Sequence, residues 1–139
     1  MAEYSRVPLS KKLGIRTNSE LVVVNEPRDY RQLIAPVPDG VRLKRRVTKT
    51  TDMVHMFTTS KRILAKLLQS CIGRMAFDAA LWVSWPKKSS KIKSDVTEDS
   101  IRGIALPLGL VDIKVCAVDD QWSGLKLVIR KENRKAGRA

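Results

Sequence analysis

Few side chains in this sequence combine a reactive type with a spacing that supports chemistry, and the densest group is the segment LWVSWPKK at residues 81–88. This segment holds two of the chain's three tryptophans and leads directly into two lysines. An indole beside two ammonium groups can bind a flat anionic ligand. On an extended strand, however, Trp82 and Trp85 point to opposite faces, so both indoles can equally cover a buried sheet. Both interpretations stay open, and Trp85, Lys87 and Lys88 form a candidate binding edge with a half-exposed indole.

The other reactive side chains indicate neither a catalytic group nor a metal site. His55 is the chain's one histidine and lies in an apolar segment, which is typical of a core residue. No second histidine can complete a triad, and no serine lies in a GxSxG motif. Cys71 and Cys116 form no CxxC pair, and Asp119 and Asp120 are better explained by a turn than by metal binding. We therefore expect no catalytic residues and no metal.

The formal net charge is +13, and the basic residues concentrate at 42–46, 87–93 and 130–138. Such a charge attracts polyanions, including nucleic acid, through counterion release. The alternative is a basic surface that only keeps the protein soluble, since no aromatic-rich RNA motif accompanies the charge.

The hydrophobic pattern contains no membrane span and no secretion signal. No apolar run approaches the roughly 20 residues that cross a bilayer, and the first residues lack the apolar core of a signal peptide. The sequence therefore predicts a soluble, cytoplasmic protein.

Short apolar runs alternate with amphipathic segments along the chain, which predicts an α/β fold. The expected strands are 20–25, 41–46, 52–58, 77–85, 110–118 and 124–130. Short helices are expected at 8–14 and 28–35, and longer ones near 60–72 and 97–108. The pattern predicts a three-layer sandwich with a mostly parallel sheet that ends in an antiparallel hairpin. We expect a lead-in over 1–19, one domain over 20–131, and a basic, disordered tail over 132–139.

Two segments resemble a known fold family. FDAALWVSWPKK (77–88) and VDIKVCAVDDQWSGLKLVIRK (111–131) are similar to the last parallel strand and the closing hairpin of the class I methyltransferase form of the Rossmann fold. The first half is shorter than in that form. The resemblance implies the strand order 41–46, 20–25, 52–58, 77–85, 124–130, 110–118. The link from about Lys44 to Met53 is the most constrained part of this order, because few residues must cross a whole strand.

More narrowly, the chain resembles a small bacterial family known only as a domain of unknown function. The matching pieces are YSRVPLSKKLGI (4–15), LWVSWPKK (81–88) and the stretch from TEDSIRGIALPLG at 97–109 to residue 134. This resemblance implies a compact Rossmann-like domain and no established activity.

In an open α/β sheet, ligands bind beyond the carboxyl ends of the strands, where the strand order reverses. The candidate ligand-binding residues all follow or end such strands: Asn25, Glu26, Thr58, Thr59, Ser60, Trp85, Lys87 and Lys88. The candidate hairpin turn comprises Asp119, Trp122, Ser123 and Gly124, with Gly124 at a positive φ.

A nucleotide or methyl-donor site on this fold needs glycines after the first strand and an acid after the second. The sequence has NEP at 25–27 and RLKRR at 42–46 instead. We therefore expect no cofactor. Our first functional expectation is a non-catalytic Rossmann-like binding or regulatory domain for a small anionic ligand or a protein partner. The alternatives are a nucleic-acid (polyanion) binding module and a diverged methyltransferase-like enzyme.

Overall fold

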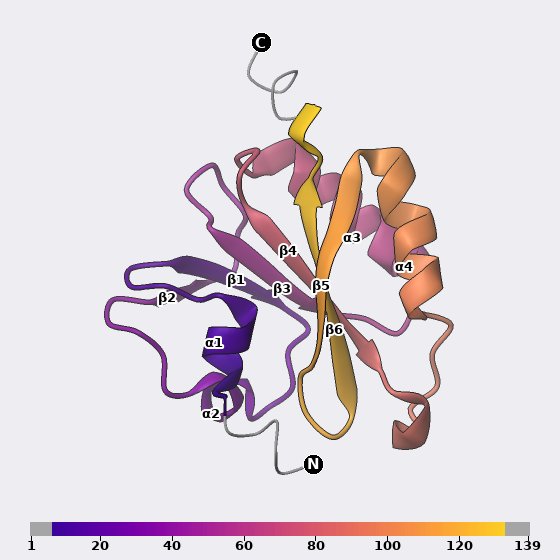
Figure 1. The fold of residues 1–139 in the computed structure, drawn as a ribbon, viewed down its shortest axis with the longest axis horizontal. Coiled ribbons are helices and arrows are strands. Elements are labelled where there is room, and N and C mark those ends of the chain that lie inside the picture. The colour runs from indigo at the N-terminus through magenta and orange to yellow at the C-terminus, as the bar shows by residue number, and fades with distance from the viewer. Residues whose placement is uncertain (1–6, 133–139) are drawn as a thin grey trace.

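The computed structural model describes residues 7–132, which form one sheet with helices on both faces (Figure 1). The strands are β1 (Glu20–Val24), β2 (Arg42–Lys44), β3 (Met53–Phe57), β4 (Ala80–Pro86), β5 (Leu110–Ala117) and β6 (Trp122–Ile129). The helices are α1 (Leu9–Leu13), α2 (Tyr30–Ile34), α3 (Lys61–Arg74) and α4 (Glu98–Ala105), with short 3-10 turns at Lys88–Ser90 and Leu106–Leu108. The expected basic tail, apart from Glu132, lies outside the described residues.

The strand order is β2-β1-β3-β4-β6-β5; β6 pairs antiparallel with both β4 and β5, and the other pairings are parallel. This confirms the predicted strand order and the predicted three-layer, Rossmann-like sandwich. Within residues 7–132, no helix combines the length and apolar character needed to cross a membrane.

The constrained link between β2 and β3 crosses β1 on the side of α3 and α4. A tight turn shortens it, in which the Thr51 amide donates to the Thr48 carbonyl at 3.1 Å. Val47 packs against the core on that side. At its end the Asp52 carboxylate accepts a hydrogen bond from the Glu20 amide at 2.8 Å, which fixes the link to the start of β1.

The sheet separates two hydrophobic cores because strand side chains alternate between its faces. Leu64 and Ile101, from α3 and α4, belong to one core, and Leu13 and Tyr30, from α1 and α2, belong to the other. The two tryptophans of β4 lie in different cores, as their spacing predicts. Trp82 is fully buried under α1, where its indole Nε1 donates to the Leu13 carbonyl at 2.9 Å.

Capping residues mark three of the helix ends. Ser60 caps α3 by accepting a hydrogen bond from the Ile63 amide at 3.2 Å. Thr97 and Ser100 form a reciprocal capping box at the start of α4. Gly14 ends α1 with a left-handed φ of 84°.

The hairpin turn is shorter than predicted. Only Asp119 of the expected residues belongs to it, because β6 already begins at Trp122 and includes Ser123 and Gly124. The Asp119 carboxylate accepts hydrogen bonds from the amides of Gln121 and Trp122, both at 2.8 Å. This side-chain turn lets the hairpin close two residues earlier.

Gly124 therefore has a different role from the predicted positive φ. It is a strand residue opposite Ser84, without a left-handed φ. A Cβ atom at this position would lie 3.1 Å from Val118 Cγ2 and 3.2 Å from Trp82 Cε3. Glycine is needed because the Trp82 indole lies across the backbone of β6.

The variant Gly124→Ala should therefore lower the free energy of unfolding by about 1–3 kcal/mol, the usual cost of overpacking a core. Gly103→Ala is the matched control, because no atom lies within 4 Å of a Cβ there and the residue is in α4. That control should gain roughly 0.5–1 kcal/mol from helix propensity. Urea denaturation of both variants measures the difference, and equal stability would contradict the close approach of Trp82.

Candidate functional site

A cavity of about 490 Å³ lies at the carboxyl ends of β1 and β2. Val23 and Leu43 line it from the two strands, Arg45 lines it just after β2, and the segment 26–32 closes it after β1. The volume falls within the usual range for small-molecule sites, roughly 300–1,000 Å³. The strand order reverses beside it, since β2 and β3 flank β1 on opposite sides. The fold therefore forms a cavity where Rossmann-like sheets bind ligands.

The turn that forms this cavity is left-handed and is made by asparagine. Asn25 directly follows β1 and has a φ of 58°. Asparagine tolerates this conformation better than most non-glycine residues. Its side chain is exposed and does not line the cavity. The backbone therefore takes a left-handed path after β1 without a glycine.

An ion pair spans the mouth of the cavity. Arg45 Nη1 and Nη2 donate to the two Glu26 carboxylate oxygens at 2.9 and 2.6 Å. Arg45 Nη1 also lies 3.3 Å from the carbonyl oxygen of Val23. The hydrogen bond from Arg45 lowers the pKa of Glu26, so the carboxylate is ionised at neutral pH. The site thus has an acid after β1 and a base after β2, whereas the expected pattern requires the acid after β2.

A buried hydrogen-bond chain forms the floor. Tyr30 is one of the lining residues and is only 2% exposed, and its hydroxyl lies 2.8 Å from His55 Nδ1. His55 Nε2 lies 2.7 Å from the Ser84 hydroxyl, so both ring nitrogens have a partner. His55 is fully buried, and burial lowers its pKa to about 3, which keeps the ring neutral at physiological pH. The histidine is a satisfied core residue, as the sequence predicted, and it holds Tyr30 in place.

Two of the residues predicted at the end of β3, Thr58 and Ser60, form hydrogen bonds with each other. The Thr58 hydroxyl donates to the Ser60 carbonyl and accepts from the Ser60 amide, both at 3.2 Å. Neither these two residues nor Thr59 lines the cavity. They shape the entry into α3.

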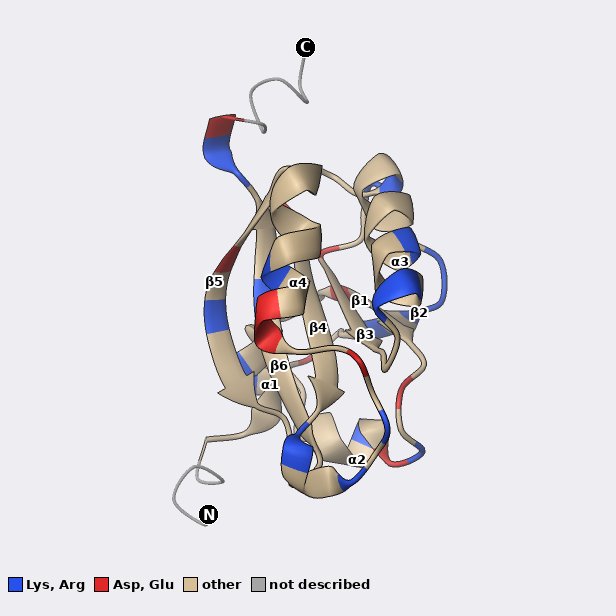
Figure 2. Cartoon of the chain, turned by 90° about the vertical axis from the view of Figure 1, so that its right-hand side faces the viewer, with Lys and Arg blue, Asp and Glu red and all other residues tan. Residues whose placement is uncertain are grey.

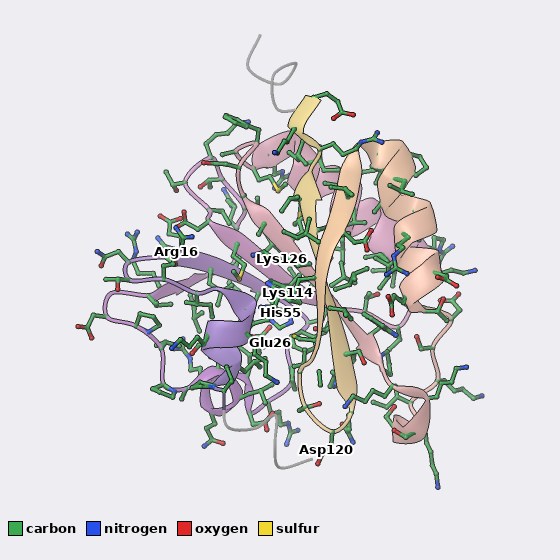
Figure 3. The ribbon with its side chains drawn as sticks, in the orientation of Figure 1. Arg16, Glu26, His55, Lys114, Asp120 and Lys126 are labelled. Carbon is green, nitrogen blue, oxygen red and sulfur yellow. The ribbon has the colours of Figure 1, made fainter. Side chains whose placement is uncertain are left out.

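The residues predicted at the end of β4 are also separate from the cavity. Trp85 is only 9% exposed and belongs to the core under α3 and α4, so the expected half-exposed indole is not found. The Lys87 amide donates to the Gln121 carbonyl at 2.8 Å, and Lys88 begins a 3-10 turn. Of the residues predicted from the sequence, Glu26 lines the cavity and Asn25 forms its turn. Figure 3 shows Glu26 and His55 on the side of the sheet that α1 covers.

Sequence reasoning missed Tyr30 and Arg45. Tyr30 is one of two tyrosines in the chain, but only the fold reveals that it covers His55. Arg45 belongs to the basic segment 42–46, which looks like a charged edge strand. Nothing in the sequence pairs it with Glu26, which lies 19 residues earlier. Within residues 7–132, no group of three metal-ligating side chains lies together.

No family model matches the chain, and no curated protein matches it either. Solved structures with the same fold include a SAM dependent methyltransferase from Aquifex aeolicus, with a TM-score of 0.56, 14% identity, and coverage of 86% of this chain and 87% of that one. The B. subtilis m1A22 tRNA methyltransferase TrmK has a TM-score of 0.55 at 10% identity, over 92% of this chain and 65% of that one. Magnesium protoporphyrin IX methyltransferase from Synechocystis has a TM-score of 0.56 at 9% identity, over 88% of this chain and 74% of that one. At these identities the likeness establishes the fold.

The comparison also corrects our first functional expectation. We expected a non-catalytic binding or regulatory domain, and this expectation is wrong. Solved structures of the same fold include a SAM dependent methyltransferase, a methyltransferase with bound SAM and a tRNA methyltransferase, which favour the methyltransferase-like alternative.

The stability of the protein should fall as the pH drops below about 6.5. At such pH values the histidine of the unfolded chain is protonated, whereas His55 of the folded protein stays neutral down to about pH 3. Between these values the free energy of unfolding should decrease by up to about 1.4 kcal/mol per pH unit. Urea denaturation between pH 7.5 and 5 measures this slope, because carboxylates titrate mostly at lower pH. His55→Gln is the control: it should lack the slope, whatever its absolute stability, and an unchanged slope would contradict the buried neutral ring.

The left-handed turn predicts opposite effects for two substitutions of Asn25. Asn25→Ala should destabilise the protein by about 1 kcal/mol, because alanine is strained at positive φ. Asn25→Gly should be neutral or stabilising, since glycine adopts this φ freely. Thermal melts of both variants test the turn, and a stable alanine variant would show that residue 25 has a different backbone conformation.

Proposed function

We propose that this chain is a methyltransferase-like enzyme that binds S-adenosylmethionine in the cavity at the carboxyl ends of β1 and β2. The observation that carries the proposal is the position of this cavity, between a left-handed turn at Asn25 and the end of β2. Several solved structures of the same fold are named for the same methyl donor, which supports this choice of ligand.

The residues around the cavity fit a nucleoside-bearing donor. The Asn25 turn leads the chain away from β1 without placing its side chain in the cavity. Glu26 supplies an ionised carboxylate, the group that accepts hydrogen bonds from ribose hydroxyls in sites of this fold. It does so from the end of β1, and thus replaces the acid that is missing after β2. When bound, the donor supplies an electrophilic methyl group to an acceptor.

The Glu26–Arg45 ion pair must open before Glu26 can accept hydroxyl groups. The Arg45 side chain is 73% exposed, so water solvates it readily when it leaves Glu26. Exposed pairs of this kind contribute about 0–1 kcal/mol, which a ligand can easily offset. The floor is more rigid, because Tyr30 is held by the buried His55. The cavity therefore has an adjustable mouth and a fixed floor.

Calorimetric titration with S-adenosylmethionine tests the proposal, with thermal melts as a second readout. The wild-type protein should bind saturably and melt several degrees higher in excess ligand. Glu26→Gln should weaken binding about tenfold or more, because a neutral amide replaces a charged acceptor worth about 1.5–3 kcal/mol. Arg45→Gln should bind as tightly as the wild type or more tightly, because it frees Glu26.

Arg42→Gln is the matched control. Arg42 lies in β2, three residues before Arg45, but it pairs with Glu20 at 3.4 Å and does not line the cavity, so binding should not change. Wild-type protein that shows no saturable binding would refute the proposal. So would a Glu26→Gln variant with wild-type affinity, or stabilisation by NAD in place of S-adenosylmethionine.

A further inference from the structure

Four basic residues meet on the α1 side of the β5–β6 hairpin, and we call them the hairpin basic cluster: Lys12, Arg16, Lys114 and Lys126. Lys114 and Lys126 are direct cross-strand partners in the β5–β6 register. Lys114 Nζ donates to the Lys12 carbonyl at 2.9 Å, and Lys126 Nζ would lie 3.6 Å from a Cβ placed on Gly14. Figure 3 labels Arg16, Lys114 and Lys126 on this side. The fold thus gathers cations that are about 100 residues apart in sequence.

This arrangement opposes folding. Like charges directly opposite each other on neighbouring strands are destabilising. Lys126 is half-buried, and its pKa is lowered first by burial and then by the charges of Lys114 and Arg16. Within residues 7–132, no carboxylate forms an ion pair with Arg16, Lys114 or Lys126. The acidic residues on α4 (Figure 2) pair with Arg102 instead.

A purely structural role explains only part of the cluster. Lys114 lies at the carboxyl end of α1, where a cation complements the backbone carbonyls. That role needs one lysine. The side chains of Lys126 and Arg16 donate no hydrogen bond within the part of the chain that the structure describes. The charges of these two side chains are therefore available to bind an external anion.

We propose that the hairpin basic cluster binds the phosphodiester backbone of nucleic acid. Lys114 and Arg16 are exposed, so the surface is open and does not enclose a small free anion. The net charge of +13 attracts the most densely charged polyanions first. Lysines contact phosphates as point charges, and an arginine can hold two phosphate oxygens. Such contacts are independent of base sequence, and the inference does not depend on the proposed methyl-donor cavity.

The test is fluorescence anisotropy with a labelled single strand of about 20 nucleotides, as RNA and as DNA, at about 50 and 200 mM KCl. The variant Lys114→Gln/Lys126→Gln should bind about tenfold more weakly at the lower salt. Its slope of log K against log salt should shrink by about 1.4, since each phosphate contact on a single strand contributes about 0.7. Its melting temperature should change little, because relief of the opposed charges offsets the loss of the Lys114 hydrogen bond to the Lys12 carbonyl. Lys114→Arg/Lys126→Arg should keep the wild-type affinity.

Lys61→Gln/Lys66→Gln is the charge-matched control, because both lysines are exposed on α3 at the other face of the sheet. It lowers the net charge equally and should retain most of the binding. Equal losses on RNA and DNA, or a loss on RNA alone, both support the cluster as a backbone site. Three results would overturn it: no salt-dependent binding by the wild type, an equal loss in the α3 control, or equally tight, cluster-dependent binding of polyglutamate.

Discussion

The left-handed turn at Asn25 is the constraint on which the candidate site depends. At a φ of 58°, the chain leaves β1 and passes into the segment that closes the cavity. The same turn places Glu26 within reach of Arg45 and directs Tyr30 onto His55. With an extended residue 25, the chain would continue past the sheet and neither of these two contacts would form. A single backbone conformation thus positions both the mouth and the floor of the site.

The two contacts that define the cavity differ in strength for a physical reason. Glu26 and Arg45 meet near solvent, where water competes for the largely exposed Arg45 guanidinium and weakens the pair. Tyr30, His55 and Ser84 meet in the core, where an unpaired polar group would cost about 1–3 kcal/mol. The mouth can therefore exchange partners while the floor cannot. This division suits a site that must admit a ligand and keep its shape.

The sequence could predict most strands and helices because apolar runs and a closing hairpin are local signals, whereas the strand order came from the resemblance to the class I methyltransferase form of the Rossmann fold. It could not predict the role of Gly124, because the reason is the indole of Trp82, which lies 42 residues earlier in the chain and touches it only after β4 pairs with β6. The sequence shows NEP in place of glycines after β1, but it could not show that Asn25 adopts a left-handed φ there. The sequence predicted Trp85 as a binding residue because it lies at a strand end, but its side chain is buried in the core. The pairing of Glu26 with Arg45, like that of Lys114 with Lys126, exists only in the folded chain.

The most direct test of the central claim is an NMR titration of the ¹⁵N-labelled protein with S-adenosylmethionine. If the donor binds in the cavity, the amide resonances of Asn25, Glu26, Tyr30 and Arg45 should shift together and saturate, while those of α3 and α4 stay in place. No shifts, or shifts confined to the region of Trp85, Lys87 and Lys88, would contradict it.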